Sequence, residues 1–209
     1  MGDCVMAFWG APVENADHAR RAVAAAQDML VAIQTLNAEH ARQGLPAIGA
    51  GIGISTGPMC VGDMGSDLRR SYTVVGDAVN LGARLESLTR VYGEDVVVSD
   101  ATRTACPHWV WQELDRVHVK GKAEAVTVFA PVAPLESLSQ AQARELACWQ
   151  EVLRCWRAQD WDGCEQHLAL LLLRSEEKVL YRLYAERVAS MRIAPPGPGW
   201  DGTTTLDRK

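Results

Sequence analysis

The hydrophobic pattern of the chain first predicts a long amphipathic helix from Ala16 to about Arg42. Apolar residues recur there every three or four positions, which is the spacing of one face of an α-helix. These positions are Ala19, Val23, Ala26, Leu30, Ile33 and Leu36. Gly44-Leu45-Pro46 ends the pattern with residues that stop helices. Because several of the apolar residues are alanines, we expect the helix to pack closely on a sheet.

Short apolar runs on either side of this helix predict β-strands. Cys4 to Trp9 is apolar and aromatic and is closed by Gly10-Ala11-Pro12, so it should be the second half of a strand whose partner lies before residue 1. Ile48 to Ser55 alternates Gly or Ala with Ile, which also predicts a strand. Cys60 to Val75 carries a Gly-Ser-Asp centre between two apolar arms and predicts a β-hairpin.

The next segment mixes helices and strands. Ala78 to Tyr92 has helical spacing, and Val96 to Val98 has the composition of a short buried strand. A brief helix from Asp100 should lead into two further strands, over Val110–Val119 and Ala125–Val132. The predicted order is β, α, β, β-hairpin, α, β, α, β, β, which is an α+β arrangement.

The composition changes near residue 135, after Pro131 and Pro134. We therefore expect one region over 1–134, a helical region over 135–193, and a Pro- and Gly-rich tail over 194–209. The spacing of Trp, Leu and Ala in the helical region resembles one tetratricopeptide-like helix pair followed by a third helix. The alternative, which we favour, is that these helices simply pack on the first region or on a second copy of it.

Charge and composition exclude several classes of function. The 209 residues carry a formal net charge of −5, and no cluster of Lys and Arg is denser than Arg69-Arg70 or Lys120-Gly121-Lys122, so nucleic-acid binding is not expected. The longest purely apolar stretch, Leu168 to Leu173, is far below the roughly 20 residues that cross a bilayer, so this segment should not contact a membrane. The six cysteines include no C-x-x-C pair and are expected to be reduced, mostly buried thiols of a cytosolic chain.

Asp3 is the first candidate for chemistry. It follows Gly2 in a predicted tight turn, directly before the apolar run that starts at Cys4, so its carboxylate should point outward. Carboxylate oxygens suit Mg²⁺, which takes few protein ligands and completes its shell with phosphates. The alternative is an ordinary turn carboxylate, and the Gly-Asp pair alone favours that alternative.

Asn80 and Arg84 form the second candidate site. They lie one turn apart on the predicted helix that follows the strand ending at Val75. A guanidinium offers a forked donor that matches phosphate oxygens, and an amide can hydrogen-bond a ribose or phosphate oxygen, so the pair could hold the α-phosphate of a nucleotide. The alternative is a solvated helix face on which Arg84 pairs with Glu86 or Asp77.

Three ordered motifs make the pattern specific. Residues 2–12 contain Gly-Asp-x-x-Met-Ala-Phe-Trp-Gly-Ala-Pro, residues 72–86 contain Tyr-Thr-Val-Val-Gly-Asp-Ala-Val-Asn-Leu-x-Ala-Arg-Leu-Glu, and Lys120-Gly121-Lys122 precedes the last predicted strand. Over about residues 2–132 the chain resembles the class III adenylate and guanylate cyclase family. The resemblance implies a ferredoxin-like domain that works as a head-to-tail dimer, with each active site shared between two chains. It also implies two Mg²⁺ or Mn²⁺ ions, attack of the 3′-hydroxyl of ATP on the α-phosphate, and loss of pyrophosphate.

The resemblance assigns a role to each candidate residue. Asp3 matches the second metal-binding carboxylate. Asn80 and Arg84, supplied to that site by the other chain of the dimer, match the pair that orients the ribose and stabilises the α-phosphate in the transition state. Lys120 matches a lysine that contacts the terminal phosphates. Thr73 matches a residue that reads the purine edge, where guanylate cyclases usually carry Cys, so it favours ATP. A hydroxyl both donates and accepts, so its chemistry alone leaves the base open.

The resemblance also implies parts that precede the counterpart of Gly2 in the family. These are a first strand with another metal-binding Asp, two helices, and a strand with a base-reading lysine. We therefore expect the 209 residues alone to be inactive as a cyclase. An alternative is a noncatalytic cyclase-like domain that serves as a dimerisation or regulatory partner, and a third interpretation, a tetratricopeptide-type interaction protein, rests only on residues 138–192.

The C-terminal region also resembles the tails of bacterial cyclases that carry a membrane-anchored sensor upstream. Its features are the helices and the closing Pro195-Pro196 and Trp200-Asp201-Gly202 segments. On this basis we expect a cytoplasmic location for these 209 residues, with a parent protein anchored through a preceding region.

Overall fold

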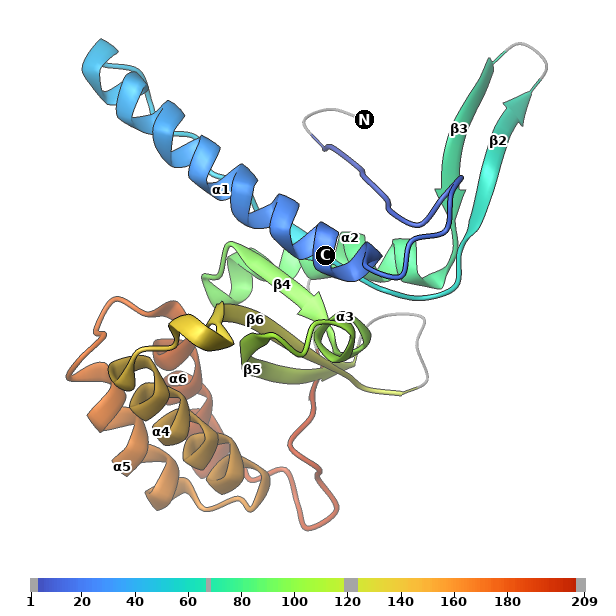
Figure 1. The fold of residues 1–209 in the computed structure, drawn as a ribbon. Helices are drawn as coiled ribbons and strands as arrows, with labels where there is room; N and C mark the ends of the chain where they lie inside the picture. The colour runs from blue at the N-terminus through green and yellow to red at the C-terminus, as the bar shows by residue number, and fades with distance from the viewer. Residues whose placement is uncertain (1–3, 67–68, 119–123, 206–209) are drawn as a thin grey trace.

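The structure is a computed structural model that describes residues 4–66, 69–118 and 124–205 (Figure 1). In chain order the elements are α1 (His18–Gln43), β1 (Ile52–Ile54), β2 (Cys60–Ser66), β3 (Arg69–Val75), α2 (Asp77–Tyr92), β4 (Val96–Ser99), α3 (Asp100–Ala105), β5 (Trp109–His118), β6 (Val126–Pro134), a 3₁₀ turn (Leu135–Ser137), α4 (Gln140–Arg157), α5 (Trp161–Leu172), α6 (Val179–Ile193) and β7 (Thr204–Thr205). Among the described residues, no helix is both long and apolar enough to cross a membrane.

A mixed five-stranded sheet forms the centre of the molecule. Its order is β1-β4-β6-β5-β7, with β1 parallel to β4, β7 parallel to β5, and the other neighbours antiparallel. The hairpin β2–β3 forms a separate two-stranded sheet that extends away from the main sheet, beyond one end of α2 (Figure 1). The expected hairpin and the α+β class are therefore confirmed.

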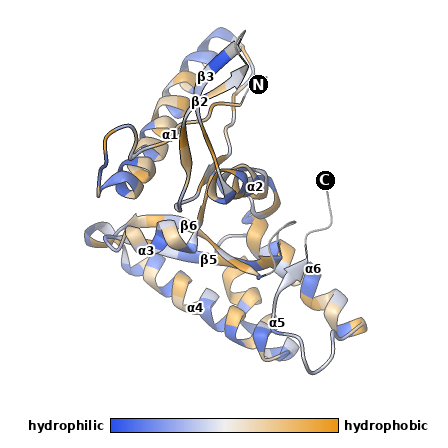
Figure 2. Ribbon diagram, turned by 90° about the vertical axis from the view of Figure 1, so that its right-hand side faces the viewer, coloured by the Kyte–Doolittle hydropathy of each residue, from blue (hydrophilic) through white to orange (hydrophobic). Residues whose placement is uncertain are grey.

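Helices cover both faces of the sheet because strand side chains alternate between the two faces. In β4, Val96 and Val98 join the core formed by the Ala-rich half of α1, whereas Val97 joins the core formed by α2 and α4 to α6. Phe129 and Val128 of β6 divide between the two cores in the same way. Figure 2 shows hydrophobic and hydrophilic residues mixed along the helices, as in amphipathic helices with one buried face.

The C-terminal helices share their core with the sheet. Trp149 and Trp156 of α4 are each 1% exposed and belong to the same buried cluster as Leu85 of α2 and Leu114 of β5. The helices therefore pack on the first region through a continuous apolar core. Their likeness to a tetratricopeptide pair stays a prediction.

The segment after α6 returns to the sheet. Trp200 packs edge-on against Trp156, with ring centroids 4.9 Å apart, and the indole N–H of Trp156 donates to the carbonyl of Gly202 (3.0 Å). Thr204 and Thr205 then pair with Val117 and His118 of β5. The closing part of the chain thus adds a short strand at the edge of the sheet.

The strand predicted from Cys4 to Trp9 is wrong. These residues form no strand in the structure, and the side chain of Val5 is 89% exposed. A strand requires a hydrogen-bonded neighbour, and no described strand pairs with this run. Its recorded ring contact is between Phe8 and Tyr72 of β3, whose centroids lie 6.1 Å apart.

The cysteines match the expectation in part. All six are free thiols, as expected. Cys106, Cys155 and Cys164 are buried, but Cys4 and Cys60 are exposed and Cys148 is half-buried, so burial holds for only half of them.

Candidate active site

The β3–α2 connection brings the candidate residues onto one structural unit. Thr73 lies on β3 opposite Gly62 of β2, and its side chain is half-buried. Gly76 joins the strand to the helix with φ +155°, a backbone conformation that favours glycine. A Cβ there would lie 3.2 Å from the carbonyl oxygen of Pro58. The tight turn therefore leaves only three residues between Thr73 and the first residue of α2.

Asn80 and Arg84 lie on α2 with their side chains available. Asn80 is exposed and Arg84 is partly exposed. Within the described residues, neither side chain has a recorded hydrogen bond or ion pair, and Glu86 bonds instead to Arg90 (3.1 Å). The alternative pairing of Arg84 with Glu86 or Asp77 is therefore not found there. An unpaired guanidinium and an amide one turn apart can both donate to an external anion.

The opposite face of α2 is fixed against the sheet. Leu81, Leu85 and Leu88 are buried in the core. Gly53 of β1 faces the helix backbone so closely that a Cβ on it would lie 2.3 Å from the amide nitrogen of Glu86. The alternation of glycine and isoleucine around β1 thus lets α2 approach the sheet directly.

Two candidate residues cannot be placed. Asp3 and Lys120 lie outside the described residues, so the structure does not bring them together with Thr73, Asn80 and Arg84. Within the described ranges, no group of three or more His, Cys, Asp or Glu side chains is gathered in a way that could hold a metal ion. The described residues alone therefore do not fit a metal site.

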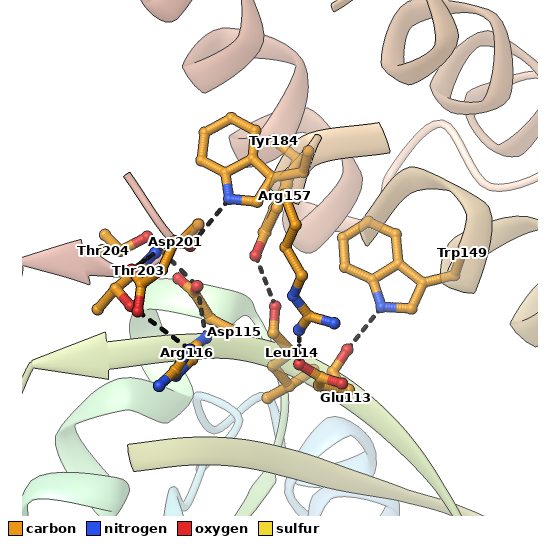
Figure 3. A network of polar contacts seen from close by, with 12 residues as sticks. Glu113, Leu114, Asp115, Arg116, Trp149, Arg157, Tyr184, Asp201, Thr203 and Thr204 are labelled. Atoms are coloured by element: carbon orange, nitrogen blue, oxygen red, sulfur yellow. Dashed lines mark hydrogen bonds and ion pairs between the residues drawn. The ribbon is translucent and has the colours of Figure 1, made fainter. Parts of the chain in front are cut away.

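The sequence did not reveal the polar contacts that surround β5 (Figure 3). The indole N–H of Trp149 donates to the carbonyl of Glu113 (2.5 Å), and the hydroxyl of Tyr184 donates to the carbonyl of Leu114 (3.0 Å). Leu114 sits at a bulge in the β5–β6 ladder, between the pairs of Glu113 and Asp115, which leaves its carbonyl to other donors. The helices therefore supply donors along the edge of β5.

Asp115 is the most buried charged residue of this network. It is 1% exposed, and its carboxylate accepts from the hydroxyl of Tyr92 (2.9 Å) and from the guanidinium of Arg187 (2.7 Å). No clear signal in the sequence indicated it, because the strand around Asp115 also carries the polar residues Gln112, Glu113 and Arg116. Because Asp115 touches Tyr92, the last residue of α2, the network reaches the helix that carries Asn80 and Arg84.

Comparison with known proteins finds similarity to nucleotidyl cyclases. The family model described as adenylate and guanylate cyclase catalytic domain matches residues 1–131. Adenylate cyclase 1 of Rhizobium meliloti (strain 1021) is 32% identical over 143 residues, covering 68% of this chain and 22% of the relative. The adenylate cyclase of Anabaena cylindrica is 35% identical over 137 residues, covering 62% and 26%. The chain thus spans about a quarter or less of the length of these curated relatives.

Solved structures agree with the fold. The guanylyl cyclase Cya2 aligns with a TM-score of 0.55 and 33% identity over 63% of this chain and 66% of that one. The adenylyl cyclase CyaB from P. aeruginosa aligns with a TM-score of 0.56 and 27% identity over 66% and 72%. Similar proteins therefore include both adenylyl and guanylyl cyclases.

Proposed function

Because the chain belongs to the adenylate and guanylate cyclase catalytic-domain family, we propose that it takes part in converting ATP to cyclic AMP and pyrophosphate for intracellular signalling. The observation that carries the proposal is the pair Asn80 and Arg84, which share one helix and have no partner among the described residues. The opposite face of this helix is buried and tightly packed against the sheet. Such packing suits side chains that must hold a fixed geometry during a reaction.

The reaction forms one bond and breaks one bond at the α-phosphorus. The ribose 3′-oxygen attacks the α-phosphorus and gives up its proton, while the bond to the pyrophosphate oxygen breaks in line. Arg84 donates hydrogen bonds to the α-phosphate oxygens as negative charge builds on them, and Asn80 orients the ribose. Lys120 neutralises the departing phosphates. Removing a donor of the kind that Arg84 supplies costs on the order of a hundredfold or more in rate.

Members of this family use divalent metal ions. Two Mg²⁺ or Mn²⁺ ions, when bound, neutralise phosphate charge and activate the attacking oxygen. We assign Asp3 to one of them. The resemblance places the other metal-binding carboxylate on a strand that precedes the counterpart of Gly2, in the same chain as Asp3.

The active site is therefore proposed to form between two chains, in a head-to-tail arrangement with a second copy or with a complete cyclase chain. Asn80, Arg84, Thr73 and Lys120 of one chain would enter a site whose metal carboxylates, the counterpart of Asp3 among them, lie on the other chain. Because Asp3 alone cannot hold two metal ions that each need several oxygen ligands, residues 1–209 alone should show no detectable cyclase activity.

Thr73 supports ATP as the preferred substrate. Its half-buried side chain lies on strand β3, which leads into α2, and its hydroxyl can hydrogen-bond the purine edge. We place the reaction in the cytoplasm, within a parent protein that is membrane-anchored through another region.

A complementation experiment tests the proposal. The 209-residue chain is mixed with a full-length class III cyclase in which the counterpart of Arg84 is replaced by Ala, and cyclic AMP is measured. We expect activity that neither protein has alone, because the chain supplies the missing guanidinium. Arg84→Ala in the chain should lower this activity by about a hundredfold or more.

Arg90→Ala is the matched control, since Arg90 lies on the same helix but pairs with Glu86 at the surface. It should leave the activity unchanged. If size-exclusion chromatography shows the mixed dimer and no cyclic AMP forms, the chain is a noncatalytic partner and the proposal is wrong.

A further inference from the structure

The end of α2 is joined to the C-terminal helices through one buried carboxylate. Asp115 of β5 accepts from donors on four elements: the Tyr92 hydroxyl of α2 (2.9 Å), the Arg187 guanidinium of α6 (2.7 Å), the Thr204 hydroxyl of β7 (3.3 Å) and the amide of Arg116 on β5 itself (2.7 Å). A buried charge is tolerated only when it is paired and hydrogen-bonded, so these elements depend on one another.

Within this cluster the direction of the Tyr92 hydrogen bond is fixed. Burial, reinforced by the nearby Asp115 carboxylate, raises the pKa of Tyr92 far above its ordinary value. Tyr92 therefore keeps its proton and acts as the donor, while Asp115 stays the acceptor that also binds Arg187. The side chain of Arg187 is only 14% exposed, so this ion pair is largely shielded from solvent.

A second set of contacts joins the same two helices. A Cβ on Gly93, which caps α2, would lie 2.5 Å from the Cβ of Val179, so the first turn of α6 is in direct contact with the end of α2. The ammonium group of Lys178 donates to the side-chain oxygen of Gln112 (2.9 Å) and to the carboxylate of Glu145 (3.3 Å), and lies 4.0 Å from the carboxylate of Glu94. The end of α2 is thus connected to α6 at two places: through Asp115 to Arg187, and directly to the start of α6 at Val179.

The same helix carries the candidate catalytic pair. Arg84 lies two turns before Tyr92, a distance of about 12 Å along the helix axis. Since α2 is continuous from Asp77 to Tyr92, a change in the direction of its last turn also moves Arg84. Displacements of about 1 Å at a catalytic group can cost on the order of a hundredfold in rate.

We propose that Arg187, acting through Asp115 and Tyr92, is a positioning residue for Asn80 and Arg84, so that the C-terminal helices set the catalytic geometry of α2. This inference rests on the proposed function of Asn80 and Arg84. It gives the region after residue 135 a role in the reaction: α6 and β7 hold the end of the helix whose exposed face meets the substrate.

Tyr92→Phe is the first test, because it removes the hydroxyl that links α2 to Asp115 and leaves the ring in the core. In the complementation assay, we expect kcat to fall by about tenfold or more, with little change in KM for ATP. Tyr184→Phe is the matched control. It also removes a fully buried hydroxyl, which lies close to Asp115 and donates to the carbonyl of Leu114, but it leaves the hydrogen bond from Tyr92 to Asp115 in place.

The comparison separates positioning from stability. If Tyr92→Phe only weakened the fold, the two variants would lose activity in proportion to their melting temperatures. We expect instead that Tyr184→Phe keeps kcat within about twofold at a similar loss of Tm. Equal losses of kcat, or no loss in Tyr92→Phe, would overturn the proposal.

Amide hydrogen exchange of the 209-residue chain gives a readout that needs no activity. Exchange in residues 77–92 should be faster in Tyr92→Phe and unchanged in Tyr184→Phe. If the wild-type chain fails to complement, the proposed function is wrong. The exchange measurement still decides whether the hydrogen bond from Tyr92 to Asp115 holds the end of α2 in place.

Variants of Arg187 add a conservative rescue. Arg187→Lys keeps the charge and should retain most of the kcat, whereas Arg187→Met should resemble Tyr92→Phe in both assays. If Arg187→Met does not fold, Tyr92→Phe and Arg187→Lys still decide, since an Arg187→Lys variant as impaired as Tyr92→Phe would argue against positioning by charge.

Discussion

Gly53 of β1 lies against the backbone of Gly82 in α2, so that a Cβ on Gly53 would stand 2.2 Å from the carbonyl oxygen of Gly82. No side chain separates the strand from the helix at this point. The contact fixes the middle of α2, between Asn80 and Arg84, on the sheet.

The first prediction is that Gly53→Ala destabilises the protein. The added methyl group would overlap helix backbone, which cannot move aside as a flexible side chain can, so we expect a loss of about 1–3 kcal/mol in the free energy of unfolding. Urea denaturation followed by circular dichroism measures it. Gly49→Ala is the control, since a Cβ there meets nothing within 4 Å. Equal stability of the two variants would show that the close contact is not present in solution.

The second prediction concerns the helices after residue 135. A chain cut after Pro134 would expose the core side chains that face α4 to α6 and would leave Asp115 without Arg187. Breaking a buried ion pair alone costs about 3–5 kcal/mol, a large part of the stability of an ordinary domain. We expect the shortened chain to bind hydrophobic dyes and to lose cooperative unfolding. Cooperative melting at the temperature of the full chain would instead mean that the two regions fold independently.

The third prediction is a pH dependence of stability caused by Glu94. Burial raises the pKa of Glu94 above its ordinary value, with Asp95 and Glu145 adding to the effect and Lys178 opposing it. The folded state then binds the proton more tightly than the unfolded state does. The contribution of Glu94 to the free energy of unfolding should therefore fall as the pH rises above the ordinary glutamate pKa.

Glu94→Gln removes this titration and should stabilise the protein more at pH 7 than at pH 4. Denaturant titrations of both proteins at several pH values measure the difference. Glu176→Gln, which removes an exposed carboxylate, is the control for net charge. A stability difference between Glu94→Gln and wild type that does not change with pH would contradict the prediction.

The fourth prediction concerns the choice of base. With ATP and GTP at equal concentration, the complemented enzyme should form mainly cyclic AMP. Thr73→Val should lower kcat/KM for ATP by about five- to tenfold, since one hydrogen bond is worth about 1 kcal/mol net. Thr73→Ser keeps the hydroxyl and should retain most of the activity. Product analysis by chromatography measures both, and mainly cyclic GMP would reverse the assignment.

Local patterns in the sequence predicted most elements correctly. The helices α1 and α2 and the hairpin β2–β3 follow from periodicity and turn residues, which depend on neighbours in sequence. The run from Cys4 to Trp9 has the composition of a strand, but a strand exists only with a hydrogen-bonded partner, which composition cannot supply. The two-residue strand β7 shows the reverse case, because its pairing with β5 alone defines it.

The candidate site, too, could be predicted only where it depends on residues close together in the sequence. Asn80 and Arg84 follow from one helix and one motif, and the structure leaves both side chains without a recorded partner among the described residues. The bonds of Asp115 to Tyr92 and Arg187 span 23 and 72 positions. No local pattern indicates such a contact, because it depends on how the C-terminal helices pack against β5.

The aromatic packing at the C-terminus gives the protein an internal optical probe. The rings of Trp156, Trp161 and Trp200 lie with centroids 4.9 to 6.2 Å apart, and Trp200 belongs to the segment that leads into β7. Indole rings packed this closely and held at fixed angles couple their electronic transitions, so they should produce a strong near-ultraviolet circular dichroism signal. Release of the closing segment from α4 would separate Trp200 from Trp156 and weaken that signal, which makes the docking of β7 observable without a label.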